Sequence, residues 1–232
     1  MRKSETEKFA VIVAGGIGKR MKSELPKQFM KLADQPVMLH TLRVFHEFDR
    51  KLKIIIVLHD GYYNIWNSIC KEYSCSIPHK IIKGGKTRFD SVKNGLGAIN
   101  NDNGFVAIHD AVRPLVNINT ISRCFNSAIK YGNAIPAVTP GDSVRINLPN
   151  ANKSVDREKV LLIQTPQVFS VARIKKAYMQ EYKSDFTDDA IVFETCGEKI
   201  NIVKGDVLNI KLTTPIDLEF AETVLKQRDR KE

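Results

Sequence analysis

The sequence predicts an α/β fold with a doubly wound, mostly parallel sheet in one domain over residues 1–232, and a β-arm at about residues 141–157. Short continuous apolar runs, typical of strands buried on both faces, alternate with amphipathic stretches of helical period. This alternation favours parallel strands joined by crossover helices. One later segment alternates with a period of two instead, which is typical of a two-stranded ribbon.

The expected elements follow from these patterns in chain order. Strands are expected at residues 9–14, 54–58, 80–82, 105–108, 134–138, 200–203 and 210–212. Helices are expected at residues 36–46, 63–73, 91–99, 119–131, 187–196 and 217–226. The run Thr187-Asp188-Asp189 caps the fifth of these helices and Gly197 closes it. The ribbon is expected at residues 143–155, where apolar residues alternate before the turn-rich residues 149–152.

Composition excludes several classes of protein. A hydrophobic content of 43% in 232 residues supports a full core. No 18 consecutive residues are apolar, so we expect no membrane span, and residues 1–8 lack the features of a secretory signal. The four cysteines have no CxxC spacing and the five histidines no HExxH pair. We therefore expect a cytoplasmic protein with reduced thiols and no zinc site.

The net charge of +10 suggests an anionic partner. Nucleic-acid binding is one interpretation of such a charge. However, the basic residues are spread along the chain, and no basic run is interleaved with aromatic residues. We therefore expect small anionic substrates and no nucleic-acid partner. A non-catalytic basic protein that binds nucleotides or nucleic acid is the alternative from a different class.

The stretch VIVAGGIGKRMKSELPKQF, residues 11–29, combines three glycines with several basic residues after the first expected strand. Glycine lets the backbone approach a ligand closely, and an anion stabilises crowded cations. Met21 stands where GxGxxG needs its third glycine, and Arg20 stands where Walker A needs Ser or Thr. The stretch therefore predicts a different loop that wraps a polyphosphate. A tight turn with solvated charges is the plainer alternative.

Other expected strands end in polar residues as well. Asp110 closes a buried strand, with Arg113 three residues later, and this pair can hold a hydroxyl, a Mg²⁺ ion or a phosphate. The run KGGKTRFDSV places two glycines, Arg88 and Ser91 after another strand, where a flat base can lie against the backbone. Each residue can also be a turn cap, a helix N-cap or a solvated charge. Their recurrence at strand ends favours a polyanion site.

Taken together, these motifs resemble those of a known family. In chain order they are AGGIGKRM with PKQF, GGKTRFDSV, HDAVRP, VDR, QTPQVF, TDDA and NIKLTTPIDL. Over residues 9–221 the sequence resembles the cytidylyltransferases of the isoprenoid pathway, specifically the 2-C-methyl-D-erythritol 4-phosphate cytidylyltransferases. The resemblance implies transfer of a cytidylyl group from CTP to that polyol phosphate, with release of pyrophosphate and with Mg²⁺ as cofactor.

The resemblance also implies roles for individual residues. Arg20 and Lys27 would stabilise charge in the transition state, while Arg157 and Lys211 would align the nucleophile. Nucleotide binding is implied for Ala14, Gly15, Gly16, Gly18, Gly85, Ser91, Asp110 and Ala111. Polyol phosphate binding is implied for Asp110, Arg113, Ser143, Arg157, Thr165, Thr187 and Lys211. Mg²⁺ would be held mainly by the CTP phosphates, with Asp110 as the candidate protein ligand, and the β-arm would form a homodimer.

Two departures from the family pattern leave the polyol open. The chain has Val13-Ala14-Gly15-Gly16 where many members have Pro-Ala-Ala-Gly, and the Ala-Gly-Gly form resembles the ribitol 5-phosphate cytidylyltransferases. Ser143 stands where threonine is usual. The motif Val155-Asp156-Arg157 resembles the isoprenoid pattern instead. We therefore expect methylerythritol phosphate as the acceptor, with ribitol 5-phosphate as the alternative.

Overall fold

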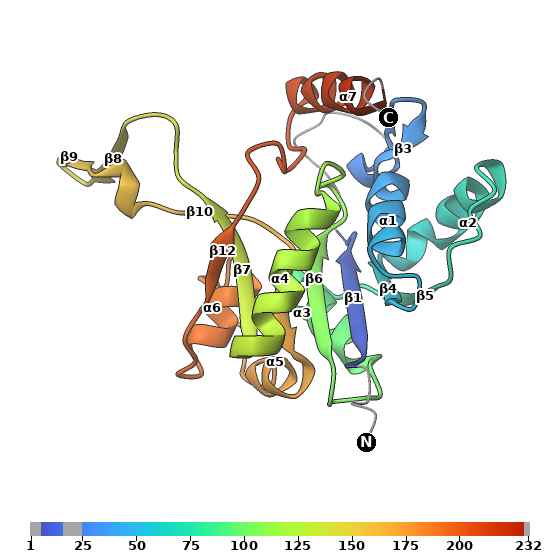
Figure 1. The fold of residues 1–232 in the computed structure, drawn as a ribbon, viewed down its shortest axis with the longest axis horizontal. Helices are drawn as coiled ribbons and strands as arrows, with labels where there is room; N and C mark the ends of the chain where they lie inside the picture. The colour runs from blue at the N-terminus through green and yellow to red at the C-terminus, as the bar shows by residue number, and fades with distance from the viewer. Residues whose placement is uncertain (1–5, 16–24, 230–232) are drawn as a thin grey trace.

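The structure is a computed structural model, and it describes residues 6–15 and 25–229. The residues expected to follow the first strand, including Gly16, Gly18 and Arg20, lie outside the described residues. Seven α-helices are described (Figure 1): α1 Val37–Phe48, α2 Tyr63–Glu72, α3 Arg88–Gly97, α4 Ile118–Tyr131, α5 Val171–Ala177, α6 Asp189–Glu194 and α7 Pro215–Asp229.

A mixed sheet forms the centre of the described chain, with the order β10-β7-β11-β6-β1-β4-β5 and with β12 beside β7. Its strands are β1 Lys8–Val13, β4 Lys53–Leu58, β5 His79–Lys83, β6 Phe105–Asp110, β7 Asn133–Val138, β10 Leu162–Ile163, β11 Gln167–Ser170 and β12 Ile202–Lys204. The run β6-β1-β4-β5 is parallel throughout, whereas β11 lies antiparallel between β6 and β7. The predicted mostly parallel sheet is therefore confirmed.

Helices cover both faces of this sheet, as a doubly wound fold requires. Successive side chains of a strand point to opposite faces, and in β1 Ala10 and Ile12 pack in one core cluster while Phe9 and Val11 pack in another. The first cluster includes residues of α1, α2 and α4, and the second includes residues of α3, α5 and α6. β1 is buried from both sides, which explains its continuous apolar sequence.

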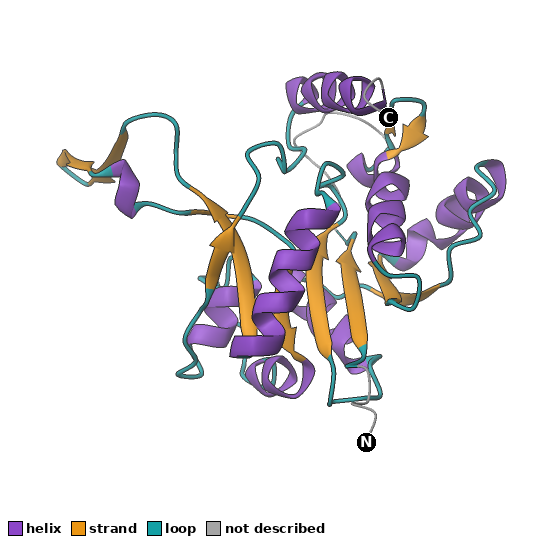
Figure 2. Cartoon of the chain, in the orientation of Figure 1, coloured by secondary structure: helices purple, strands orange, loops and turns teal. Residues whose placement is uncertain are grey.

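The ribbon expected at residues 143–155 is an antiparallel hairpin of β8 Val144–Leu148 and β9 Ala151–Val155. It projects away from the sheet and its helices (Figures 1 and 2). Ile146 is 52% exposed and Leu148 is 46% exposed. The hairpin therefore forms through local pairing, without burying these two apolar side chains in its own chain.

Three sequence predictions differ from the structure. Residues 210–212, expected as a strand, are irregular; Leu212 N–H donates to Val112 O, outside any ladder. The helix expected at residue 91 begins at Arg88, because Thr87 and Asp90 form a capping box one turn earlier. The sequence predictions omitted β10, β11 and α5. β11 contains only four residues, and its pairing depends on distant strands.

Small elements complete the description: β2 Lys31–Leu32, β3 Gln35–Pro36, and the 3-10 turns η2 Lys27–Phe29, η3 Asp60–Tyr62 and η4 Arg157–Lys159. In the described part of the chain, no helix combines the length and the apolar content needed to cross a bilayer.

Candidate active site

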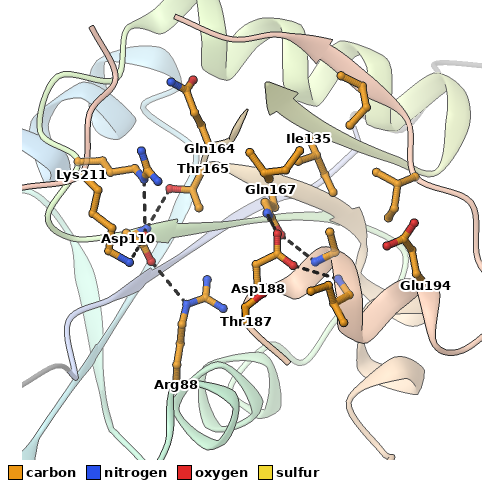
Figure 3. Close-up of a pocket in the computed structure, with 16 residues that line it drawn as sticks. Arg88, Asp110, Ile135, Gln164, Thr165, Gln167, Thr187, Asp188, Glu194 and Lys211 are labelled. Atoms are coloured by element: carbon orange, nitrogen blue, oxygen red, sulfur yellow. Dashed lines mark hydrogen bonds and ion pairs between the residues drawn. The ribbon is translucent and has the colours of Figure 1, made fainter. Parts of the chain in front are cut away.

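Asp110, the last residue of β6, lies among three cationic side chains. Lys211 Nζ is 2.9 Å from its carboxylate, Arg88 Nε is 3.5 Å away and Arg113 Nε is 3.6 Å away. Figure 3 shows Arg88 and Lys211 approaching Asp110 from separate segments of the chain. We call these four residues the strand-end cluster. One carboxylate neutralises one of the three cations, so the cluster carries excess positive charge.

The electrostatics of the cluster keep Asp110 ionised. Burial alone would raise the pKa of its carboxyl, but Arg88, Lys211 and Arg113 hold that pKa well below its usual range. Arg113 Nη1 donates to Asn209 O, while its Nε has no hydrogen-bond partner among the described residues. That Nε is buried and faces the Asp110 carboxylate at 3.6 Å, so the guanidinium is held between Asn209 and Asp110.

Arg88 belongs to a buried network that also includes Asp189. The guanidinium donates two hydrogen bonds to the Asp189 carboxylate, at 2.9 and 2.7 Å, and Tyr178 Oη donates a third at 2.6 Å. Asp189 is fully buried as the first residue of α6. Arg88 therefore joins the first turn of α3 to the first turn of α6, beside Asp110.

A cavity of about 550 Å³ opens beside the strand-end cluster. Thr165 and Thr187 line it together with Asp110, Arg113 and Lys211, as predicted for the polyol phosphate (Figure 3). Thr165 Oγ1 accepts the Asp110 N–H at 3.2 Å. One end of the cavity is therefore cationic, and hydroxyl groups lie next to it.

The residues predicted to bind the nucleotide base also converge. Ser91 Oγ accepts the Gly85 N–H at 3.1 Å and donates to Thr87 O at 2.9 Å. A Cβ on Gly15 would lie 3.1 Å from that oxygen, and a Cβ on Gly85 would lie 2.2 Å from Asp90 Cβ. The segments that follow β1 and β5 therefore meet the first turn of α3, and glycine is sterically required at residue 85.

Ala14 and Ala111 continue two neighbouring strands at the same edge. Ala14 N–H donates to Val57 O and Ala111 N–H donates to Val13 O. Ala14 O in turn accepts a 2.8 Å hydrogen bond from the buried Gln28 side chain. Ala14 is 4% exposed and Ala111 is 0% exposed, so the backbones of both alanines, like their side chains, are almost fully buried within the chain.

Lys27 begins the 3-10 turn η2, and its Nζ donates to Leu212 O at 3.1 Å. This bond brings Lys27 to the segment that carries Lys211. Two of the four predicted catalytic residues are thus close in space, although they are 184 positions apart in the sequence. Arg20, the third, lies outside the described residues.

Ser143 and Arg157 lie at the base of the hairpin, and neither lines the cavity. Arg157 is exposed, donates to Gly141 O at 2.8 Å and lies 3.4 Å from Glu158. The single chain therefore does not bring these two predicted residues to the strand-end cluster.

The sequence interpretation named Arg88 only as a strand-end residue and Asp189 only as part of a helix cap, and it did not pair them. Arg88 follows the Gly84-Gly85 pair at the start of a helix, and this position next to a glycine turn is the only sequence feature that indicates a role in the site. Asp189 lies in the TDDA motif, but its partner is 101 residues away. Their pairing could not be inferred from local spacing.

Comparisons with known proteins show the family of this chain. The family model for 2-C-methyl-D-erythritol 4-phosphate cytidylyltransferase (IspD) matches residues 9–227. The chain belongs to this family. A family member from Bacteroides fragilis is 46% identical over 216 residues, which cover 93% of this chain and 98% of the relative. A relative of the same name from Lachnospira eligens is 40% identical, with 94% and 98% covered.

Solved structures of the family share the fold. The 4-diphosphocytidyl-2C-methyl-D-erythritol synthase of Anaerococcus prevotii aligns with a TM-score of 0.81 and 28% identity, covering 95% of this chain and 99% of that one. The Francisella tularensis family structure aligns with a TM-score of 0.77 and 30% identity, covering 94% and 99%. The family and the nucleotidyltransferase fold predicted from the motifs are confirmed.

Proposed function

We propose that the protein transfers a cytidylyl group from CTP to 2-C-methyl-D-erythritol 4-phosphate. The products are 4-diphosphocytidyl-2-C-methyl-D-erythritol and pyrophosphate, in isoprenoid biosynthesis. The observation that carries this proposal is the strand-end cluster, whose three cations meet around Asp110 beside a cavity large enough for a polyol phosphate. Small anions are the fitting partners for cations gathered in one pocket.

CTP is proposed to lie at the edge formed by β1, β5 and the first turn of α3. The residues around the base and ribose would be Ala14, Gly15, Gly85 and Ala111, with the Ser91 hydroxyl fixing the loop that carries Gly85. Gly16 and Gly18 would offer backbone N–H groups to the phosphates. The convergence of Gly15, Gly85 and Ser91 supports this place, because a Cβ at Gly85 would overlap Asp90 and only glycine fits the turn against α3.

The reaction is proposed as direct displacement at the α-phosphorus of CTP. A phosphate oxygen of the polyol attacks, a new P–O bond forms, and the bond to the β-phosphate breaks as pyrophosphate leaves. Lys211 and Arg113 would hold the attacking phosphate, with Asp110, Thr165 and Thr187 on the polyol. Arg20 and Lys27 would stabilise the charge that develops around the triphosphate.

Mg²⁺ is proposed as the cofactor, and it would neutralise phosphate charge when bound. Asp110 fits poorly as its ligand, since both carboxylate oxygens face cations at 2.9–3.6 Å. Residues 6–15 and 25–229 also contain no cluster of three His, Cys, Asp or Glu side chains suited to a metal. We therefore propose that the CTP phosphates carry the ion.

A homodimer through the hairpin is proposed to complete the site. Ser143 and Arg157 lie outside the cavity of their own chain, and the exposed Ile146 and Leu148 would be buried by a partner. In a two-fold dimer the hairpin of one subunit can reach the cavity of the other. Arg157 would then align the nucleophile in the partner's site.

The proposed location is the cytoplasm. All four cysteines are free thiols, and free thiols are typical of a reducing compartment. No nucleic-acid or membrane partner is proposed.

A substrate panel tests the proposed function. Pyrophosphate release from CTP should require a polyol phosphate, and kcat/KM with methylerythritol phosphate should exceed that with ribitol 5-phosphate by at least about tenfold. If kcat/KM for ribitol 5-phosphate is equal or higher, the protein is a ribitol 5-phosphate cytidylyltransferase instead. No release with either acceptor would instead support a non-catalytic nucleotide-binding protein.

A further inference from the structure

His109 is a buried histidine next to Asp110 that the proposed reaction does not use. Its side chain is 0% exposed and packs edge-on against Phe45, with ring centroids 5.0 Å apart. Nε2 lies 3.3 Å from Arg113 O, and Nδ1 lies 3.0 Å from Thr165 Oγ1. Both ring nitrogens therefore contact residues that line the cavity.

These contacts determine which ring nitrogen carries the proton. A carbonyl oxygen can only accept a hydrogen bond, so the 3.3 Å contact between Nε2 and Arg113 O favours the tautomer with its proton on Nε2. Burial lowers the pKa of His109 to about 3, with Asp110 and Arg113 acting in opposite directions, so the ring is neutral near pH 7. A neutral imidazole has one N–H, and Nδ1 is therefore an acceptor.

The state of His109 fixes the direction of the Thr165 hydroxyl. A hydroxyl has one proton to donate and two lone pairs that accept. The proton of Thr165 Oγ1 is donated to His109 Nδ1, and one lone pair accepts the Asp110 N–H. The remaining lone pair is available to the cavity that Thr165 lines.

The backbone of Thr165 is fixed as well. Its carbonyl accepts a 2.8 Å hydrogen bond from the buried Asn209 side chain, and Asn209 O accepts from Arg113. The hydroxyl therefore cannot turn towards the cavity through a small shift of the main chain without breaking these bonds.

We propose that His109 is a positioning residue that holds the Thr165 hydroxyl proton, so that Thr165 accepts a hydrogen bond from a substrate hydroxyl. This inference rests on the proposed function and deepens it. Thr165 and Asp110 then form a pair of acceptors for the hydroxyl groups of the polyol, while Arg113 and Lys211 receive its phosphate. A phosphate oxygen, which only accepts, would be rejected at Thr165.

Substrate analogues test the direction of this hydrogen bond in the unaltered enzyme. Each hydroxyl of methylerythritol phosphate is replaced in turn by hydrogen or by fluorine, which cannot donate. At the carbon that faces Thr165, both replacements should raise KM equally, by about five- to tenfold. That carbon is recognised because Thr165→Val should remove the penalty there. The inference is wrong if the fluorine analogue at that carbon has the KM of the natural substrate. It is also wrong if Thr165→Val removes the rise in KM at no carbon.

Variants of His109 test its action through Thr165. His109→Phe removes the acceptor and should raise KM for the polyol phosphate about five- to tenfold, with KM for CTP within about twofold. His109→Asn offers a carbonyl oxygen near the place of Nδ1 and should retain more affinity than His109→Phe. His79→Phe is the matched control, because His79 also accepts a hydrogen bond, from Trp66, but does not line the cavity.

A double-variant cycle separates positioning from a general structural role. When Thr165→Val is already present, His109→Phe should change KM for the polyol phosphate by less than about twofold. Fully additive effects would overturn the inference while leaving the cytidylyltransferase assignment intact. Absence of transfer to every polyol phosphate would overturn the proposed function and this inference together. If His109→Phe does not fold, the same cycle is measured with His109→Asn, and the analogue series with the unaltered enzyme still tests the direction of the Thr165 hydrogen bond.

Discussion

The strand-end cluster and the base of the β8–β9 hairpin each contain an arginine, and the two arginines are held differently. Arg88 has its guanidinium bonded to the buried Asp189 and lies beside Asp110. Arg157 is exposed and contacts only its own segment, at Gly141 and Glu158, among the contacts described. The cluster is thus organised within one chain, whereas the hairpin arginine has no described contact with the cavity.

This difference predicts effects of very different size on the free energy of unfolding. Arg88→Met leaves the fully buried Asp189 carboxylate without its cationic partner, so the free energy of unfolding should fall by about 3–5 kcal/mol. Arg157→Met, the matched variant on the hairpin, should change it by less than about 0.5 kcal/mol. Urea titrations with linear extrapolation measure both values. If both variants lower the free energy of unfolding by similar amounts, the two arginines do not differ in their contribution to stability.

Catalysis should depend on Lys27, which contacts the segment that carries Lys211 of the cluster. Lys27→Ala is expected to lower kcat by about 100-fold, or about 3 kcal/mol, because its ammonium meets charge that builds up in the transition state. Steady-state kinetics give the answer. A rise in KM with kcat unchanged would make Lys27 a ground-state binder instead.

Mixing two inactive variants links the regions across subunits. If Arg157 serves the partner's site, a hybrid of Lys27→Ala and Arg157→Ala subunits has one site with both lesions and one site with none. Random exchange of equal amounts makes about half of the dimers hybrid, so about a quarter of all sites should regain activity. Differently tagged chains must first show that subunits exchange. Exchange without recovered activity would place Arg157 in its own chain's site.

The cluster should also respond to pH through His109. Its pKa is lowered from 6.5 to about 3 in the folded protein, so between these values the unfolded state binds one more proton. The stability that His109 contributes is present above about pH 6.5 and is lost as the pH falls, by about 1.4 kcal/mol per pH unit. Wild type should therefore lose stability more steeply than His109→Asn between pH 6 and pH 4. Parallel profiles in urea titrations would contradict a buried neutral ring.

Local patterns predicted much of this protein correctly. The apolar runs gave the parallel strands, because a strand buried on both faces needs apolar side chains at every position. Asp188 caps α6 through a bond from Ile191 N–H, as the TDDA run indicated. The alternating residues before residues 149–152 predicted the hairpin. These features depend on neighbours within a few positions, so the sequence itself carries their signal.

Pairings across long distances could not be predicted in this way. β11 inserts antiparallel between β6 and β7, and the four residues of this strand give no periodicity to detect. Residues 210–212 are apolar enough to suggest a strand, yet their place is set by Lys27, Asp110 and Val112, which bond to them from elsewhere.

The sequence by itself determined the fold class, the family and the positions of Asp110, Arg113 and Lys211 as candidates. Periodicity and turn chemistry act within a few residues, and the motifs keep their order along the chain. Only the tertiary structure decided that Arg88 pairs with Asp189 and that His109 meets the Thr165 hydroxyl. Those contacts join residues 101 and 56 positions apart. They form because packing helices on both faces of one sheet brings the strand ends and helix starts to the same edge.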